Sequence, residues 1–478
     1  MSRAKSDAAH MGGTSDREGP VRFESVQGRL VIAAAALGSG VAFLDGSVVN
    51  TALPSIQRQF DASLAGQQWV VTGYLLTLGS LLVVGGSLGD LFGRRRVFVL
   101  GLVGFAVTSL LCGLAPNLSV LIGARIAQGV SAAALVPGSL AMLSAVFHPD
   151  DRSRAIGAWS GLSTVSSAIG PFLGGWLIDT ISWRWIFLIN PVLIAAAVWM
   201  AQRFVPETRS GTAVRRIDIP GALALSAGLA GVVFALIEGP PKRWEASAVL
   251  AGILGAAALA AFVVIEGRSS SPMVPLSLFR SKRFAGTNAA TFVIWGALGA
   301  VFFLLTIHLQ NDLGYSALEA GAASLPVTVL MMLFAARSGA IAQRIGPRLQ
   351  MVVGPLVVAT GFALMSRIAP GSRYLTTVLP PVFVFGLGLV ITVAPLTATV
   401  LAAVSDQYAG VGSAINNAVA RVASLLAIAV LPSLAGIAST DPTSLGNGFS
   451  RAMWICAALS VVGSAICALT IVNTKCAE

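Results

Sequence analysis

The stretch "GSLGDLFGRRRVFVLG" at residues 86–101 has a second copy in the chain, "GAIAQRIGPRLQMVVG" at residues 339–354. Five of the sixteen aligned positions are identical without a gap, and three of those five are glycines. Each copy connects two apolar segments, so the repeat marks corresponding places in two halves of the chain. Internal repeats of parallel topology are typical of membrane transporters, in which the substrate site lies between the repeats near the middle of the bilayer.

The composition around the repeat is that of an integral membrane protein. The 478 residues are 55% hydrophobic and only 11% charged, with a mean hydropathy of +0.82, whereas a soluble domain has about 25% charged residues. Fourteen apolar runs are long enough to span a bilayer. Their approximate limits are 30–54, 68–89, 97–115, 119–146, 154–178, 185–205, 217–238, 246–265, 285–309, 317–341, 349–368, 375–403, 409–438 and 449–472. The short gaps leave no room for a sizeable soluble domain.

The position of the repeat among these runs predicts the domain organisation. One copy joins runs 2 and 3 and the other joins runs 10 and 11, so the halves are offset by eight spans. We therefore predict an all-α membrane protein with a six-helix bundle at 29–208, two linking helices at 209–268 and a second six-helix bundle at 269–474. Residues 1–28 and 475–478 are expected to be cytoplasmic tails. The first tail is expected to be disordered because it is polar and mixed in charge.

The net charge of +11 is distributed as in a membrane protein rather than a nucleic-acid-binding protein. With the N-terminus inside, 21 of the 31 Lys and Arg residues lie on the inner side and 7 on the outer side. This positive-inside bias predicts that both termini are cytoplasmic. The expected partners are the lipid bilayer, protons and a small-molecule substrate, and the expected state is a monomer.

The chemistry-bearing residues do not suggest an enzyme. The four cysteines have neither metal-ligand nor disulfide-framework spacing. The predicted spans contain no paired carboxylates or Ser/His pair, and the chain has no nucleotide-binding loop. We expect no metal and no cofactor.

One carboxylate, Asp45 in "VAFLDGSVVN" (41–50), lies well inside a predicted span. Burial of an unpaired carboxylate costs several kcal/mol, so a partner is expected. Helix rise places Asp45 about 13 Å and Arg125 about 9 Å from the outer end of their spans. An ion pair between them would stabilise both charges, and we predict that Asp45 and Arg125 couple proton movement to transport. A static salt bridge that only fixes packing is the alternative.

Two further groups of residues are predicted to take part in the conformational change or to close the outer side of the protein. The gating loop at the first repeat has glycines for a tight turn and charges that can pair, and the alternative is that its arginines only set the membrane topology. Its members are Gly86, Asp90, Gly93, Arg94 and Arg95. The fifth span has a bendable, closely packing stretch, for which ordinary small-residue packing is the alternative. Its members are Gly170, Pro171, Gly174 and Gly175.

Aromatic and polar residues inside the spans are candidates for a drug-accepting cavity between the halves. They are Asn50, Trp69, Tyr74, Gln128, Trp295, Asn416 and Arg421. Arg421 lies about 18 Å into its span. It is interpreted either as a site for an anionic part of a substrate or as a structural residue.

Several of these segments resemble one transporter family. "GSLGDLFGRRR" looks like the loop signature of the major facilitator superfamily, and "LDGSVVNTALPSI" (44–56) resembles the first-span signature of its 14-span drug:proton antiporter branch. "IGARIAQGVSAAALVPGSLAML" (122–143) and "SAIGPFLGGWL" (167–177) resemble its fourth-span and fifth-span motifs, and "LGYSALEAGAASLP" (313–326) is also similar to that branch. The second-half loop departs from the pattern because Gln343 replaces the acid.

The resemblance implies two six-helix bundles, alternating access, and export driven by inward proton flow. We therefore expect proton-coupled efflux of drugs or small amphipathic compounds across a bacterial cytoplasmic membrane. A dedicated exporter of one endogenous metabolite, antibiotic or lipid on the same fold remains the alternative.

Overall fold

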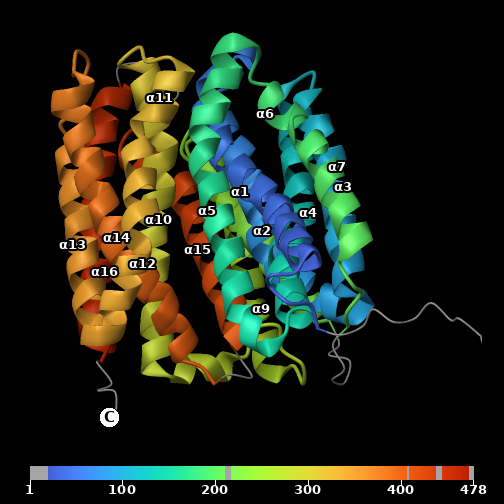
Figure 1. The fold of residues 1–478 in the computed structure, drawn as a ribbon. Helices are drawn as coiled ribbons and strands as arrows, with labels where there is room; N and C mark the ends of the chain where they lie inside the picture. The colour runs from blue at the N-terminus through green and yellow to red at the C-terminus, as the bar shows by residue number, and fades with distance from the viewer. Residues whose placement is uncertain (1–19, 210–216, 406–408, 438–443, 473–478) are drawn as a thin grey trace, which may run out of the picture.

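The computed structural model describes residues 20–209, 217–405, 409–437 and 444–472, and most of them are helical (Figure 1). Fourteen helical segments among these residues are long and apolar enough to cross a bilayer, which confirms the predicted number. The helices of the first half and the linker are α1 (Val26–Phe60), α2 (Leu64–Phe92), α3 (Arg94–Gly113), α4 (Leu118–Val146), α5 (Pro149–Thr180), α6 (Trp185–Leu188), α7 (Asn190–Phe204), α8 (Ile219–Glu238) and α9 (Ala246–Arg268). Those of the second half are α10 (Lys282–Asn311), α11 (Ala317–Ala323), α12 (Leu325–Ile345), α13 (Pro347–Met365), α14 (Leu379–Ala402), α15 (Ala409–Leu434) and α16 (Ser444–Thr470), with short turns η1 (Leu276–Arg280) and η2 (Tyr374–Val378).

Two of the fourteen spans are each built from two α-helices, and a third joins the π-helical turn η2 to α14. Helices α6 and α7 form one span, and α11 and α12 form another. A proline lies in the first turn of the second helix in both cases, Pro191 in α7 and Pro326 in α12. Proline has no N–H to donate to the preceding turn, so it starts a helix readily but interrupts one that is already running.

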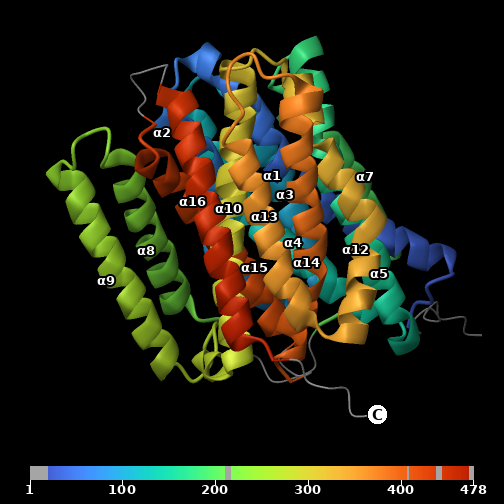
Figure 2. The same cartoon turned by 90° about the vertical axis from the view of Figure 1, so that its left-hand side faces the viewer.

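The linking pair lies to one side of the other helices. Helices α8 and α9 pack on each other, and α8 also contacts α2 of the first half and α15 of the second half. Figure 2 shows this pair in green at the edge of the molecule. The linker therefore touches both halves without separating them.

The first described residues correct the predicted disordered tail. Residues 20–28 are structured: the Val21 N–H donates to Val146 O at 2.9 Å, and the His148 N–H donates to Val21 O at 3.1 Å. Helix α1 begins at Val26, with the Ser25 side chain as its N-cap. The segment is ordered because Val21 is buried and its backbone pairs beside the end of α4. Residues 1–19 and 475–478, also predicted to be tails, lie outside the described residues.

The molecule has two ends, which we name by the chain. At the termini end α1 begins and α16 ends, and at the opposite end α1 leads into α2 (Figure 1). Hydrogen bonds join the two halves toward the opposite end. Gln68 Nε2 donates to Ile428 O at 2.6 Å, and Gln310 Nε2 donates to Thr51 O at 2.9 Å.

Candidate functional site

The centre of the first half contains a buried ion pair. Asp45 on α1 and Arg125 on α4 form a salt bridge, and their side chains are 0% and 1% exposed. Gln128 Nε2 donates to Asp45 Oδ1 at 3.1 Å, and Asn190 Nδ2 donates to the same oxygen at 3.3 Å. Arg125 also donates to Gln128 Oε1 at 2.6 Å and to Val70 O at 3.1 Å. The carboxylate is therefore surrounded by donors, as a buried charge requires.

Tyr74 covers this pair. Its ring centroid lies 4.4 Å from Arg125 Cζ, and its hydroxyl donates to Ala42 O at 3.3 Å. The side chain is only 2% exposed. The cavity prediction is therefore corrected for two residues, because Tyr74 and Gln128 are buried around the ion pair rather than on an open cavity wall.

Asn190 is a site residue that the sequence analysis missed. It stands at the start of α7, directly before Pro191, and it donates to Ser109 Oγ at 2.8 Å as well as to Asp45. An asparagine followed by a proline inside an apolar run marks a helix break. At such a break an amide can turn inward without competing with the helix backbone.

The predicted fifth-span glycines lie where α5 crosses its neighbours. A Cβ added at Gly170 would collide with Ser47 Oγ, and one added at Gly174 would collide with Val48 Cγ2, both on α1. On the other side, a Cβ at Gly175 would lie 2.5 Å from Ala317 O of α11. Close backbone approach between membrane helices requires small residues of this kind. Helix α5 thus packs tightly against both α1 and the second half.

Pro171 and Asp179 strengthen the contact between α5 and α11. Pro171 lies inside α5, and its carbonyl approaches Gly321 so closely that a Cβ there would collide with it. The Asp179 carboxylate accepts from Ala317 N at 3.1 Å and Leu318 N at 2.8 Å. A carboxylate at the free N–H groups of a helix start is stabilising. Asp179, which the sequence analysis did not select, therefore joins the halves at the opposite end.

The loop of the first repeat forms a compact charged turn at the termini end. Arg94 Nη2 and Nε donate to Asp90 Oδ1 at 2.8 and 3.0 Å, and Arg94 Nη1 reaches Ala141 O at 3.3 Å. Gly93 has a φ of +108°, which other residues rarely adopt. Gly86 faces Pro137 of α4 at ordinary contact distance. Asp90, Gly93 and Arg94 thus lie together at the α2–α3 turn, whereas Gly86 lies within α2, about two helical turns before it.

Glu207, which follows α7, completes this loop and was missed by the sequence analysis. Its carboxylate accepts from Arg95 N at 3.1 Å and Arg96 N at 3.2 Å, at the N-terminus of α3. The Arg95 and Arg96 side chains lie 3.7 and 3.8 Å from the same carboxylate. An acidic residue just after the sixth span was the only sequence signal, and its partner is more than a hundred residues away.

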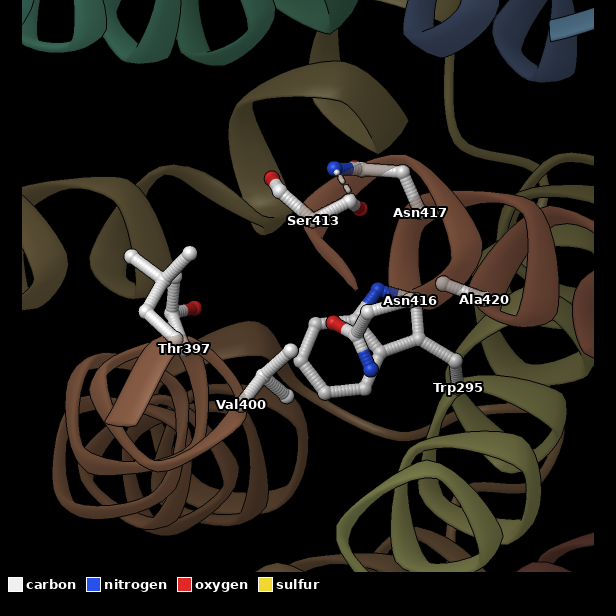
Figure 3. Close-up of a pocket in the computed structure, with 8 residues that line it drawn as sticks. Trp295, Thr397, Val400, Ser413, Asn416, Asn417 and Ala420 are labelled. Atoms are coloured by element: carbon white, nitrogen blue, oxygen red, sulfur yellow. Dashed lines mark hydrogen bonds between the residues drawn. The ribbon is translucent and has the colours of Figure 1, made fainter. Parts of the chain in front are cut away.

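A pocket lies in the second half, between α10, α14 and α15 (Figure 3). Its polar wall consists of Thr397, Ser413, Asn416 and Asn417, and its apolar wall of Trp295, Val400, Leu401 and Ala420. Asn416 Nδ2 donates to Thr291 Oγ1 at 2.8 Å and to Asn288 Oδ1 at 3.1 Å, which fixes this amide in the wall. Of the predicted cavity residues, Trp295 and Asn416 line this pocket.

The remaining cavity candidates lie elsewhere. Trp69 Nε1 donates to Glu238 Oε1 at 3.0 Å, so its indole faces the linking helix α8 and the cavity prediction is corrected for it. Asn50 is half-buried, and its Oδ1 has no hydrogen-bond partner in the described structure. Arg421 directly follows the pocket residue Ala420, and its Cζ lies 5.9 Å from the Phe43 ring.

Comparison with known proteins assigns a family to this architecture. The family model described as Major Facilitator Superfamily matches residues 35–428. The chain is 36% identical to "Puromycin resistance protein pur8" of Streptomyces alboniger, over 84% of this chain and 80% of that protein. It is 35% identical to "Multidrug resistance protein Stp" of Mycobacterium tuberculosis, over 85% of this chain and 75% of that protein.

A solved structure with the same fold is a bacterial homologue of the human lysosomal transporter Spinster, in an inward-facing and unoccupied conformation. The TM-score is 0.66 at 15% sequence identity, and the match covers 94% of this chain and 97% of the other. At this identity the likeness concerns the fold alone.

Proposed function

Because this chain belongs to the Major Facilitator Superfamily, we propose that it exports drugs or small amphipathic compounds across a bacterial cytoplasmic membrane in exchange for protons. The observation on which the proposal depends is the Asp45–Arg125 pair, a titratable carboxylate held inside the helix bundle. The relatives described above bear names of resistance proteins, which supports export as the direction of transport.

The orientation follows from charge. The termini end has most of the Lys and Arg residues, so we assign it to the cytoplasm under the positive-inside rule. Contacts of Gln68, Gln310 and Asp179 then join the halves on the outer side. The pocket residues Leu401 and Ser413 lie toward the cytoplasmic ends of α14 and α15. This arrangement fits an inward-facing state of a monomer whose two bundles move as units, with α8 and α9 linking them.

The ion pair supplies a mechanism for coupling. In the inward-facing state of this proposal, Asp45 is paired with Arg125. Access from the outer side would allow a proton to neutralise Asp45 and release Arg125 from it. One proton crossing 100 mV supplies about 2.3 kcal/mol. A proton that binds from the outer side and is released to the inner side would therefore drive the cycle.

Helix packing connects this event to the moving interface. Asp45 lies on α1, which packs on α5 at Gly170 and Gly174. Helix α5 in turn packs on α11 of the second half at Gly175. A rearrangement of α1 around a neutral Asp45 would therefore displace α5. The movement of α5 would in turn change its contact with α11 of the second half.

A dedicated exporter of one compound is the second candidate. The name of the Streptomyces alboniger relative refers to a single antibiotic, whereas that of the Mycobacterium tuberculosis relative refers to many drugs. The range of compounds exported by cells that express this chain separates the two functions.

The test is drug-linked proton movement in inverted membrane vesicles. We would compare the wild type with Asp45→Asn, using Asp61→Asn as the matched control, because Asp61 is exposed and has a φ of 49° that asparagine tolerates. The wild type and the control should dissipate an imposed proton gradient when a transported compound is added, and Asp45→Asn should not. Equal responses of all three proteins would refute the coupling role of Asp45.

A further inference from the structure

One face of α15 is polar and lines the pocket of the second half. Five residues share this face because each is three or four residues from another. They are Ser413, Asn416, Asn417, Ala420 and Arg421. The first four of them line the pocket (Figure 3). Arg421 stands at the end of this face, one helical turn beyond Asn417.

Arg421 lies against the other half of the protein. Its Cβ is so near α2 that a Cβ added at Gly79 would lie 3.3 Å from it, and its guanidinium faces Phe43 of α1. No hydrogen-bond acceptor or carboxylate within the described ranges is paired with this guanidinium. A charged arginine in the middle of a membrane bundle is therefore left with a partly buried, unneutralised charge, which is costly unless a ligand completes the site.

Asp45, on the same helix as Phe43, does not neutralise Arg421, because its carboxylate is bound to Arg125 beneath Tyr74. No acidic side chain of the described residues lines the pocket. None of the residues that line the pocket is charged, so Arg421, next to the lining residue Ala420, is the charged side chain that directly follows the pocket wall on α15.

We infer that Arg421 is the anion-recognition residue of the substrate pocket, and that the preferred substrates are amphipathic molecules with a carboxylate or a comparable planar anionic group. This inference rests on the proposed export function and names its substrate class. The guanidinium offers a fork of N–H donors that matches a carboxylate with two parallel hydrogen bonds. Trp295, Val400 and Leu401 would contact the apolar body, and Asn416 and Asn417 would contact its polar substituents. Lipophilic cations would be repelled by the same charge.

The charge of the substrate also changes the electrical work of the cycle. Exchange of one proton for one monoanion moves two charges in the same direction, whereas exchange for a neutral compound moves one and exchange for a monovalent cation moves none. Membrane potential would therefore accelerate export of an anionic substrate more than that of its neutral analogue.

The test is ligand binding to purified, full-length protein in lipid nanodiscs. Fusidate serves as an amphipathic carboxylate probe, its methyl ester as the neutral match, and ethidium as the cation. The wild type should bind fusidate about tenfold or more tighter than the ester, as expected for charge-assisted hydrogen bonds. Arg421→Gln should abolish this ratio, and Arg421→Lys should restore part of it. Arg58→Gln is the control, because Arg58 is exposed at the opposite end and donates to Ser55 of its own helix.

Three results would overturn the inference: fusidate fails to bind the folded wild type, the ester binds as well as fusidate, or Arg421→Gln retains the ratio. A monodisperse elution profile and an unchanged melting temperature establish that each variant is folded. Failure of the inference is distinguishable from failure of the export proposal. If the protein prefers fusidate but no compound causes proton movement, only proton-coupled export is contradicted. If export is coupled to protons but anions are not preferred, only the role of Arg421 is contradicted.

Discussion

The two halves of the molecule use the same turn with different chemistry. Gly93 in the first repeat has a φ of +108°, and Gly346 at the matching place in the second has a φ of +84°. Asp90 and Arg94 form an ion pair in the first copy, whereas Gln343 and Pro347 occupy those positions in the second. Both halves therefore need a glycine with a positive φ at this turn. The ion pair between Asp90 and Arg94 is present only in the first half.

The same contrast holds inside the membrane. The first half pairs its buried arginine with Asp45, and the second half leaves Arg421 beside a pocket with no acidic partner among the described residues. A paired charge can be switched by a proton, and an unpaired charge can bind a ligand. This comparison agrees with the proposals above, in which the first half couples proton movement and the second half recognises the substrate.

The largest expected effect comes from breaking the buried pair. Arg125→Gln leaves Asp45 buried and uncompensated, which should lower the free energy of unfolding by about 3–5 kcal/mol. The double variant with Asp45→Asn should recover most of this loss because no charge is then left unpaired. Unfolding titrations with sodium dodecyl sulfate in mixed micelles measure both. If the double variant is as unstable as the single one, the destabilisation comes from packing rather than charge.

A smaller loss is expected at the crossing of α5 with α1. Gly174→Ala places a methyl group in contact with Val48 where no space exists, and should cost about 1–3 kcal/mol. Gly161→Ala on the same helix is the matched control, because a Cβ there meets no atom within 4 Å. Melting temperatures in detergent and transport rates in proteoliposomes should fall only for Gly174→Ala. A similar fall in both variants would indicate a general intolerance of α5 to larger residues.

The charge network of the first-half loop should contribute less. Glu207→Gln weakens the capping of α3 and the contacts with Arg95 and Arg96, and we expect a loss of about 1 kcal/mol because Glu207 is partly exposed. Glu24→Gln removes a carboxylate whose side chain is 78% exposed and should have almost no effect. The same unfolding titration compares them. Equal effects would mean that Glu207 acts only through surface charge.

The smallest effect is expected from rebuilding the missing pair in the second half. Gln343→Asp with Pro347→Arg restores an i, i+4 ion pair at the second turn, worth about 0.2–0.5 kcal/mol. Pro347→Arg alone is the control. We expect a slight gain in melting temperature and unchanged transport. The first-half network also includes Glu207, and the double variant introduces no acidic residue in its place. A clear change in transport rate would show that this ion pair by itself controls the conformational change of the loop.

The number of spans and the special position of Asp45 could be predicted from the sequence because both depend on local properties. A run of apolar residues must be long enough to cross the bilayer, and a lone carboxylate within it needs a partner at similar depth. Helix rise was sufficient to match Asp45 with Arg125. The repeat located Gly93 and Gly346, because only glycine adopts such a turn without strain.

The direction in which each side chain points could not be predicted in this way. Trp69 faces α8 and Gln128 faces Asp45, and both had been expected at the cavity. Asn190 and Glu207 reach partners that are 145 and 112 residues away, so the local signals at these residues do not identify their partners. The spans and the buried carboxylate that needs a partner could be recognised from the sequence, since they follow from hydrophobic length and the cost of burying charge. Apart from the Asp45–Arg125 pair, the partners became known only from the packed helices, because they depend on the rotation and crossing of helices that are distant in the chain.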